Sequence, residues 1–355
     1  MGEFNVIDSC CASVATMKRG ILEHMTEITS LEICGGAGGQ ALGLEMAGFH
    51  HQAVLEWDAD ACNTLRLNRG DEWNVIEGDI REIDVTEYRG VDLFAGGVPC
   101  PPFSIAGKQL GSDDERDLFP RALEMIEQVQ PKAVLLENVR GLASAKFGPY
   151  RQAIINRLEE MGFFVHWQVI HASEHGVPQL RPRFVLVALQ REYEEYFSWP
   201  APEGTPPTVG NALYDLMAAN GWPGAERWAR RANGIGPTLV GGSKKHGGPD
   251  LGPTRARAAW AELGVKGSSL AESAPGPEVP VDEMPRLTVR MAARIQGFPD
   301  DWQFAGRKTA AYRQVGNAFP PPVARALGLA IQRALKKESQ AEALPVMQLP
   351  LTLAA

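Results

Sequence analysis

Short apolar runs alternate with segments of helical periodicity along the first half of the chain. Seven of these runs have the length and composition of β-strands: 29–34, 52–56, 75–76, 91–95, 133–137, 163–170 and 183–189. Helical patterns separate them, most clearly at 40–47, 59–67 and 118–129. Strands that alternate with helices in this way predict an α/β fold with a doubly wound, mostly parallel sheet covered on both faces.

Beyond residue 190 the pattern changes. Proline and glycine cluster at 201–210, 234–253 and 272–280, with short helical segments between them, which indicates a smaller, loop-rich second domain. Helical order returns at 286–302 and in a final helix at 323–335. We therefore expect the following division: a leader or expression remnant at 1–24, a catalytic and cofactor-binding domain at 25–190, the small domain at 191–305, a segment returning to the catalytic domain at 306–337, and a tail at 338–355.

Length and composition indicate a globular protein without a membrane span. The chain has 355 residues, of which 44% are hydrophobic and 22% charged, so it can bury a substantial core. No apolar run approaches the roughly 18 to 20 residues of a membrane span. The five cysteines form no CxxC pair, which favours reduced thiols in a cytoplasmic protein. We expect any cysteine chemistry to be catalytic and no metal to be required.

Charge is distributed unevenly. The formal net charge of -8 argues against binding nucleic acid over the whole surface. Residues 227–257, however, contain seven basic side chains and one acidic one, Asp250. Such a stretch can neutralise phosphates, although a solvated positive surface would have the same composition.

A glycine-rich turn follows the first predicted strand, in the segment LEICGGAGG at 31–39. A ligand can approach the backbone closely there, but a tight turn without a ligand or a dehydrogenase-type phosphate loop would use the same residues. Glu56 ends the second strand, Trp57 follows it, and Asp79 follows the third strand. Carboxylates suit a ribose diol and an adenine amino group, and an aromatic ring can cover the base. Each acid alone is more typical of a helix cap or a surface, but their placement after consecutive strands predicts a nucleoside-containing cofactor.

The segment GGVPCPPFS, residues 96–104, directly follows an apolar strand. Its three prolines fix the backbone and exclude a helix or a central strand, so Cys100 is expected on a rigid loop at the carboxyl edge of the sheet. Enzymes of this fold place reacting groups at that edge. A lone cysteine is usually a small buried hydrophobe, but a core cysteine would not stand among three prolines, which favours a nucleophile.

The next strand ends in ENVRG at 137–141. Glu137 should therefore face the same edge as Cys100. A partly desolvated carboxyl group can hold a proton and hydrogen-bond a pyrimidine. A helix-capping acid remains the alternative for this residue taken alone.

Over residues 29–335 the order and content of these segments resemble the DNA cytosine-5 methyltransferases. Further matches are QLRPR at 179–183, RLTVRMAARIQGFP at 286–299 and YRQVGNAFPPPVARALG at 312–328. The resemblance implies a class I, Rossmann-like methyltransferase fold with a target-recognition domain, and S-adenosyl-L-methionine as cofactor. The implied cofactor-binding residues are Gly36, Gly38, Glu56, Trp57, Asp79, Ile80, Pro99 and Asn317. The implied catalytic residues are Cys100, Glu137, Arg181 and Arg183.

The chain departs from the usual family pattern at two places. Where the family usually has Asp-Leu-Phe, this chain has Glu32, Ile33 and Cys34, so an aromatic contact to the adenine is missing. Met291 also replaces a frequent acidic residue, which should affect packing rather than chemistry.

By this resemblance we expect a monomeric enzyme that methylates carbon 5 of a flipped-out cytosine in a specific double-stranded DNA sequence, with a restriction endonuclease as genetic partner. Specificity is expected in 191–285, particularly in 238–257. The candidate DNA contacts are Lys244, Lys245, Arg255 and Arg257. The alternatives are a cytosine-5 methyltransferase acting on transfer RNA, and a catalytically silent DNA-binding relative.

Overall fold

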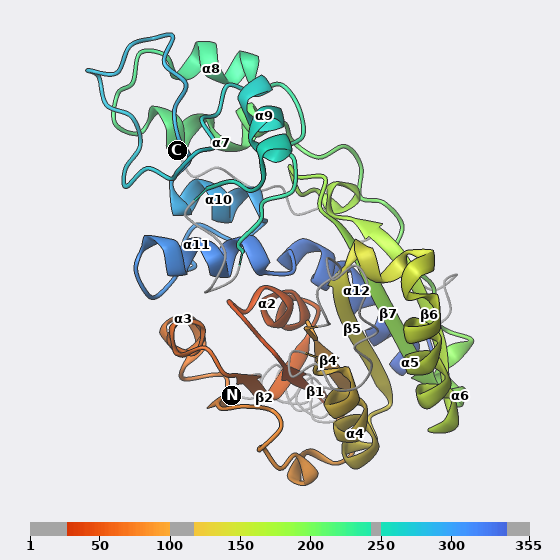
Figure 1. The fold of residues 1–355 in the computed structure, drawn as a ribbon. Helices are drawn as coiled ribbons and strands as arrows, with labels where there is room; N and C mark the ends of the chain where they lie inside the picture. Colours follow the sequence, from red (N-terminus) through yellow and green to blue (C-terminus); the bar gives the residue numbers. More distant parts are fainter. Residues whose placement is uncertain (1–26, 100–116, 243–249, 339–355) are drawn as a thin grey trace, which may run out of the picture.

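The computed structural model describes residues 27–99, 117–242 and 250–338. In these ranges seven strands form one sheet in the order β3-β2-β1-β4-β5-β7-β6 (Figure 1). The strands are β1 (Ile28–Ile33), β2 (Phe49–Glu56), β3 (Val75–Glu77), β4 (Leu93–Gly96), β5 (Ala133–Val139), β6 (Phe163–His171) and β7 (Pro182–Gln190). β7 runs antiparallel to both of its neighbours, and the other pairs are parallel. The predicted α/β fold and its mostly parallel sheet are confirmed.

Helices cover both faces of this sheet, as the buried central strands β1, β4, β5 and β7 require. In chain order the α-helices of the described ranges are α2 (Gly39–Met46), α3 (Ala59–Arg69), α4 (Phe119–Val129), α5 (Gly148–Glu160), α6 (Arg191–Glu194), α7 (Val209–Ala218), α8 (Ala225–Arg231), α9 (Thr254–Glu262), α10 (Val289–Ile295), α11 (Lys308–Asn317) and α12 (Pro321–Leu335). Short 3-10 helices are η1 (Thr86–Tyr88), η2 (Arg140–Ala143), η3 (Ala145–Phe147) and η4 (Ala172–His175). α4 and α5 share one core with the strands, while α2 and α12 share another on the opposite face.

Small residues let α2 and α12 approach closely. A Cβ atom on Gly43 would stand 2.4 Å from both Ala324 Cβ and Pro321 O, and one on Gly328 would stand 2.7 Å from Ala47 Cβ. A side chain at either glycine would force these helices apart. The packing fixes the position of α2, which begins in the glycine-rich turn.

A buried histidine ties α2 to the sheet. His51 in β2 lies 2.9 Å from Ser30 Oγ through Nδ1 and 2.9 Å from Ala41 O through Nε2. Its ring also meets Trp73 edge to face. Burial lowers the pKa of His51 to about 4, so the neutral ring donates to Ala41 and accepts from Ser30.

Figure 1 shows α7 to α10 stacked above the sheet. Their core contains Trp228, Trp260 and Trp302, and it continues into Leu65 and Trp73 of the first half of the chain.

The domain boundaries remain a prediction. Residues 1–24 and 339–355, expected as leader and tail, lie outside the described residues. Among the described helices, none is both long and apolar enough to cross a membrane.

Candidate active site

The carboxyl ends of β4 and β5 bring two predicted site segments together. Gly96 pairs with Leu136, so the residues that follow β4 lie beside Glu137. A Cβ atom on Gly97 would stand 3.4 Å from Glu137 Oε2. Asn138 Nδ2 donates a hydrogen bond of 2.7 Å to Val98 O, which fastens the start of the predicted catalytic loop to β5.

Pro99 is exposed, and its carbonyl oxygen accepts a 3.2 Å hydrogen bond from Leu118 N. Cys100 lies outside the described residues. The positions of Gly97, Val98 and Pro99 show that the chain enters the Pro-Cys segment directly beside Glu137.

Glu137 and Arg183 form a buried ion pair. Glu137 Oε1 lies 2.8 Å from Arg183 Nε, and each side chain is about one-tenth exposed. The pair exists because β7 is antiparallel to β5, which sets Arg183 opposite Val139. Burial raises the pKa of Glu137, and the nearby guanidinium groups of Arg183 and Arg181 oppose that rise. This carboxyl group therefore takes a proton more readily than an exposed one does.

Arg181 occupies a different place from Arg183, although the sequence separates them by one residue. Its side chain is fully buried and donates to Leu239 O at 2.9 Å through Nη1. Its Nη2 donates to Gly316 O at 2.9 Å and to Ala318 O at 2.8 Å. Arg181 thus joins the start of β7 to two distant segments of backbone.

Two glutamines that the sequence reasoning missed extend this connection. Gln179 Nε2 donates to Gln296 Oε1 at 2.7 Å, and Gln179 Oε1 accepts from Leu239 N at 2.7 Å. Both glutamine side chains are fully buried. The sequence offered one signal for Gln179, its position just before the two arginines in QLRPR. Its partners could not be predicted, because they are 60 and 117 residues away in the chain. The network fixes the backbone around Leu239, where the predicted recognition segment begins.

The glycine-rich turn after β1 has a strained backbone. Cys34, Gly36 and Gly38 have φ values of 54°, 53° and 81°, in the left-handed region that glycine adopts at low cost. A Cβ atom on Gly38 would also stand 2.7 Å from Leu65 Cδ2, whereas one on Gly36 would meet nothing within 4 Å. The turn therefore leaves open space beside Gly36.

Glu56 holds this turn from the end of β2. Its Oε2 accepts a 2.7 Å hydrogen bond from Gly36 N, and its Oε1 accepts from Trp57 N at 2.9 Å and Asp58 N at 2.8 Å. Burial raises the pKa of Glu56, and these backbone hydrogen bonds oppose that rise. The residue after it, Trp57, is 70% exposed.

Asp79 and Ile80 follow β3, which pairs with β2 so that Glu77 lies opposite Glu56. Arg81 Nε lies 3.0 Å from both carboxylate oxygens of Asp79, and these hydrogen bonds lower the pKa of Asp79. Ile80 is buried. An open turn, two carboxyl groups and an exposed aromatic ring thus meet along one sheet edge, and this donor set fits a nucleoside.

The remaining predicted residues lie on the C-terminal helices or outside the described ranges. Asn317 ends α11, is exposed, and donates from Nδ2 to Gly242 O at 3.1 Å. Arg255 and Arg257 lie in the first turn of α9; Arg255 is exposed and Arg257 packs beside Gly267. Lys244 and Lys245 lie outside the described residues.

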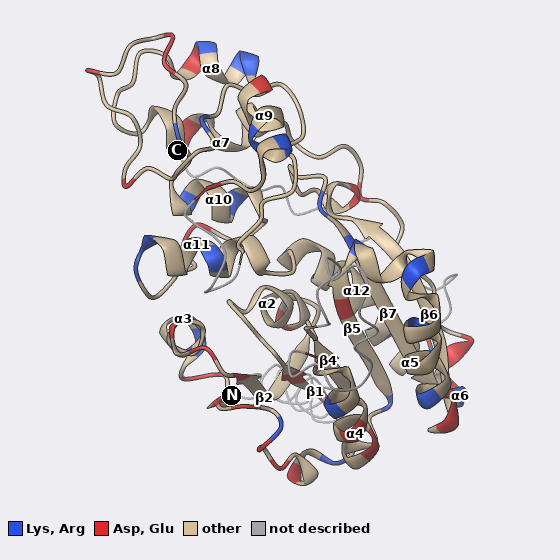
Figure 2. Ribbon diagram, viewed as in Figure 1, with Lys and Arg blue, Asp and Glu red and all other residues tan. Residues whose placement is uncertain are grey.

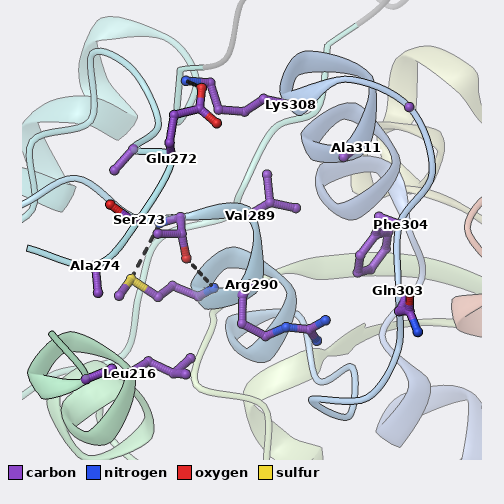
Figure 3. Close-up of a pocket in the computed structure, with 15 residues that line it drawn as sticks. Leu216, Glu272, Ser273, Ala274, Val289, Arg290, Gln303, Phe304, Lys308 and Ala311 are labelled. Carbon is purple, nitrogen blue, oxygen red and sulfur yellow. Dashed lines mark hydrogen bonds and ion pairs between the residues drawn. The ribbon is translucent and has the colours of Figure 1, made fainter.

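A surface hollow of about 550 Å³ lies elsewhere, between α7, α10 and α11 (Figure 3). Arg290, Phe304 and Lys308 line it, and Lys308 Nζ is 2.5 Å from Glu272 Oε1. None of the predicted site residues contributes to its lining.

Comparisons with known proteins identify relatives of this chain. The chain is 57% identical over 320 residues to the type II methyltransferase M.NaeI of Lentzea aerocolonigenes, covering 89% of this chain and 77% of the relative. It is 54% identical over 317 residues to M.NgoMIV of Neisseria gonorrhoeae, covering 88% of this chain and all of the relative.

Solved structures of lower identity share the fold. A putative DNA modification methyltransferase encoded within a prophage of Escherichia coli superposes with a TM-score of 0.61 at 22% identity, covering 87% of this chain and 99% of that one. The Entamoeba histolytica methyltransferase EhMeth superposes with a TM-score of 0.62 at 15% identity, covering 88% and 99%. The profile of the C-5 cytosine-specific DNA methylases matches residues 28–333. The chain belongs to this family and is a DNA cytosine-5 methyltransferase.

Proposed function

We propose that the chain moves a methyl group from S-adenosyl-L-methionine to carbon 5 of a cytosine rotated out of duplex DNA, through a covalent bond between Cys100 and carbon 6. The observation that supports this proposal most directly is the buried Glu137–Arg183 pair, 2.8 Å apart, beside the backbone that leads into Cys100. A proton donor, a cation and a nucleophile-bearing loop are the groups that activation of a pyrimidine ring needs.

Carbon 5 of cytosine is a poor nucleophile until a thiolate adds to carbon 6 and converts the ring into an enamine. Burial raises the pKa of Cys62 to about 12 and also raises that of Cys34, so neither side chain supplies a thiolate readily. We assign the addition to Cys100, which the sequence places on a proline-fixed loop.

Glu137 assists the addition by donating a proton to ring nitrogen 3; burial raises its pKa, so this carboxyl group is protonated more easily than an exposed one. Arg183 holds Glu137 in place, and we assign to its guanidinium group the binding of the cytosine carbonyl oxygen. Carbon 5 then bonds to the methyl group while the bond between that methyl group and sulfur breaks. The carbon 5 proton leaves to a base or water, and the electron pair of that C–H bond re-forms the C5=C6 double bond and expels the Cys100 thiolate. The proton on ring nitrogen 3 returns to the Glu137 carboxylate. The target must first leave the base stack, at a cost of a few kcal/mol that protein contacts offset.

We propose S-adenosyl-L-methionine as the cofactor because the residues of the glycine-rich turn and the neighbouring strand ends fit a nucleoside. Gly36 provides open space, Glu56 and Asp79 provide carboxyl groups, and Trp57 and Ile80 provide apolar surfaces for the adenine. When bound, S-adenosyl-L-methionine supplies an electrophilic methyl group on a sulfonium. Gly38, Pro99 and Asn317 complete the proposed site.

The names of the relatives suggest the biological role of the enzyme. The relatives M.NaeI and M.NgoMIV are named as type II methyltransferases, so we propose that this chain protects one DNA sequence from a cognate restriction endonuclease. We further propose that it acts as a monomer in the cytoplasm, where it meets its DNA.

The decisive experiment is bisulfite sequencing of a plasmid treated with the purified protein and cofactor. We expect methylated cytosines at one recurring sequence, none with Cys100→Ser, and normal levels with Cys62→Ser. The serine in the control can keep the hydrogen bond that Cys62 Sγ donates to Glu56 O. A duplex containing 5-fluorocytosine should trap the wild-type protein covalently, because fluorine cannot leave as a proton does.

The outcomes separate the alternatives. Methylation of transfer RNA without methylation of DNA would indicate the RNA enzyme. Duplex binding without methylation would indicate the silent relative. Trapping by Cys100→Ser at the wild-type rate would remove Cys100 from the mechanism.

A further inference from the structure

The segment after Glu137 is basic in a protein that is acidic overall. Residues 138–158 contain four basic side chains and no acidic one, while the formal net charge of the chain is -8. Two of the four are exposed on the short helices that follow β5: Arg140 begins η2 and Lys146 lies in η3. Neither forms an ion pair with any residue in the described ranges. Their charges are therefore available to a partner.

This segment is held rigidly against the body of the protein. Arg151 in α5 donates from Nη1 to Leu142 O at 2.6 Å and to Ser144 O at 3.3 Å. The Arg151 guanidinium also lies 4.4 Å from the ring centroid of Trp167, and the Leu142 side chain is fully buried. Arg140 and Lys146 are thus carried by a backbone whose position is already fixed, which lowers the entropy lost on binding.

The position of the segment identifies the partner. Arg140 is three residues beyond Glu137, a chain distance of at most about 10 Å, at the sheet edge where the proposed reaction occurs. Duplex DNA carries one negative charge per ~1.7 Å of its axis, so a cytosine delivered to Glu137 brings several phosphates past this edge. Figure 2 shows basic residues also on α8 and α9, across from this edge of the sheet.

We propose that Arg140 and Lys146 form a phosphate-binding surface for the DNA that flanks the target cytosine. This inference rests on the proposed function. The surface contributes affinity and orientation without reading sequence, because phosphates are the same at every base pair.

The test is the salt dependence of duplex binding, measured by fluorescence anisotropy with Arg140→Ala, Lys146→Ala and the double variant. We expect the slope of log K against log salt to fall by about 0.9 for each residue removed. We expect an unchanged methylated sequence and an unchanged turnover at saturating DNA. Arg140→Lys should restore most of the slope.

Lys132→Ala is the matched control, because Lys132 precedes β5 at the opposite end of the same strand and pairs with Asp92 at 2.6 Å. Its slope should equal that of the wild type. Unchanged slopes in the Arg140 and Lys146 variants, with a wild-type protein that methylates DNA, would overturn this inference alone. A wild-type protein that neither binds nor methylates duplex DNA would instead overturn the proposed function.

Discussion

Glu137→Gln should separate the structural role of the carboxyl group from its chemical role. In the wild type, Glu137 Oε1 accepts from Arg183 Nε at 2.8 Å, with about a tenth of each side chain exposed. Removing one partner of a buried ion pair costs about 3 to 5 kcal/mol, because the other charge stays buried without compensation. A glutamine keeps the shape and can still accept a hydrogen bond from Arg183, which recovers about 1.5 to 3 kcal/mol.

The net loss of unfolding free energy is therefore expected to be about 2 kcal/mol for Glu137→Gln and about twice that for Glu137→Ala. Urea titrations followed by tryptophan fluorescence measure both values. The loss of turnover should not be larger for Glu137→Ala than for Glu137→Gln, unlike the loss of stability, because neither side chain can deliver a carboxylic proton to ring nitrogen 3. Both variants are expected to lose about 100- to 10,000-fold in the rate under saturating DNA.

Duplex affinity should stay near the wild-type value in Glu137→Gln, since the side chain acts on the flipped base and not on phosphates. The measurements are single-turnover methylation rates and anisotropy titrations on the same duplex. A wild-type rate for Glu137→Gln would remove the carboxyl group from the chemistry. A rate loss that tracks the stability loss would mean that the ion pair serves the fold alone.

Three further predictions concern the cofactor site, the buried histidine and DNA reading. Asp79→Ala should weaken S-adenosyl-L-methionine binding about tenfold by calorimetry, while Glu77→Ala, which removes an exposed acid paired with Arg66, should not; equal affinity in both would contradict the site. Because burial lowers the pKa of His51 from 6.5 to about 4, the unfolded chain binds this proton more readily than the folded protein. Unfolding free energy should thus fall by roughly 3 kcal/mol as the pH drops through that window, and urea titrations of His51→Gln should show a flatter pH dependence. Arg255→Ala or Arg257→Ala should relax discrimination at one base pair by about 1 to 3 kcal/mol; an unaltered methylated sequence in both would place recognition elsewhere.

The strands and the glycine-rich turn could be predicted from sequence because their signals are local. All seven predicted apolar runs are strands. The central strands β1, β4, β5 and β7 are buried along most of their length, and a strand buried on both faces needs a continuous apolar run whatever its neighbours are. Gly36 and Gly38 were expected in a turn that glycine alone adopts at low cost, and their φ values are positive. Glu137 was placed at the edge that receives the Cys100 loop, because carboxyl ends of parallel strands meet at one edge.

The tertiary structure alone decided how the two arginines are used. Arg183 meets Glu137 because β7 is inserted antiparallel between β5 and β6, and apolar periodicity does not encode strand direction. Arg181 lies just before that strand and contacts carbonyl oxygens 58 to 137 residues away. Gln179 and Gln296 find each other across 117 residues. Such contacts depend on which segments the whole chain brings together when it buries its apolar faces. The spacing of residues along the sequence does not predict which segments these are.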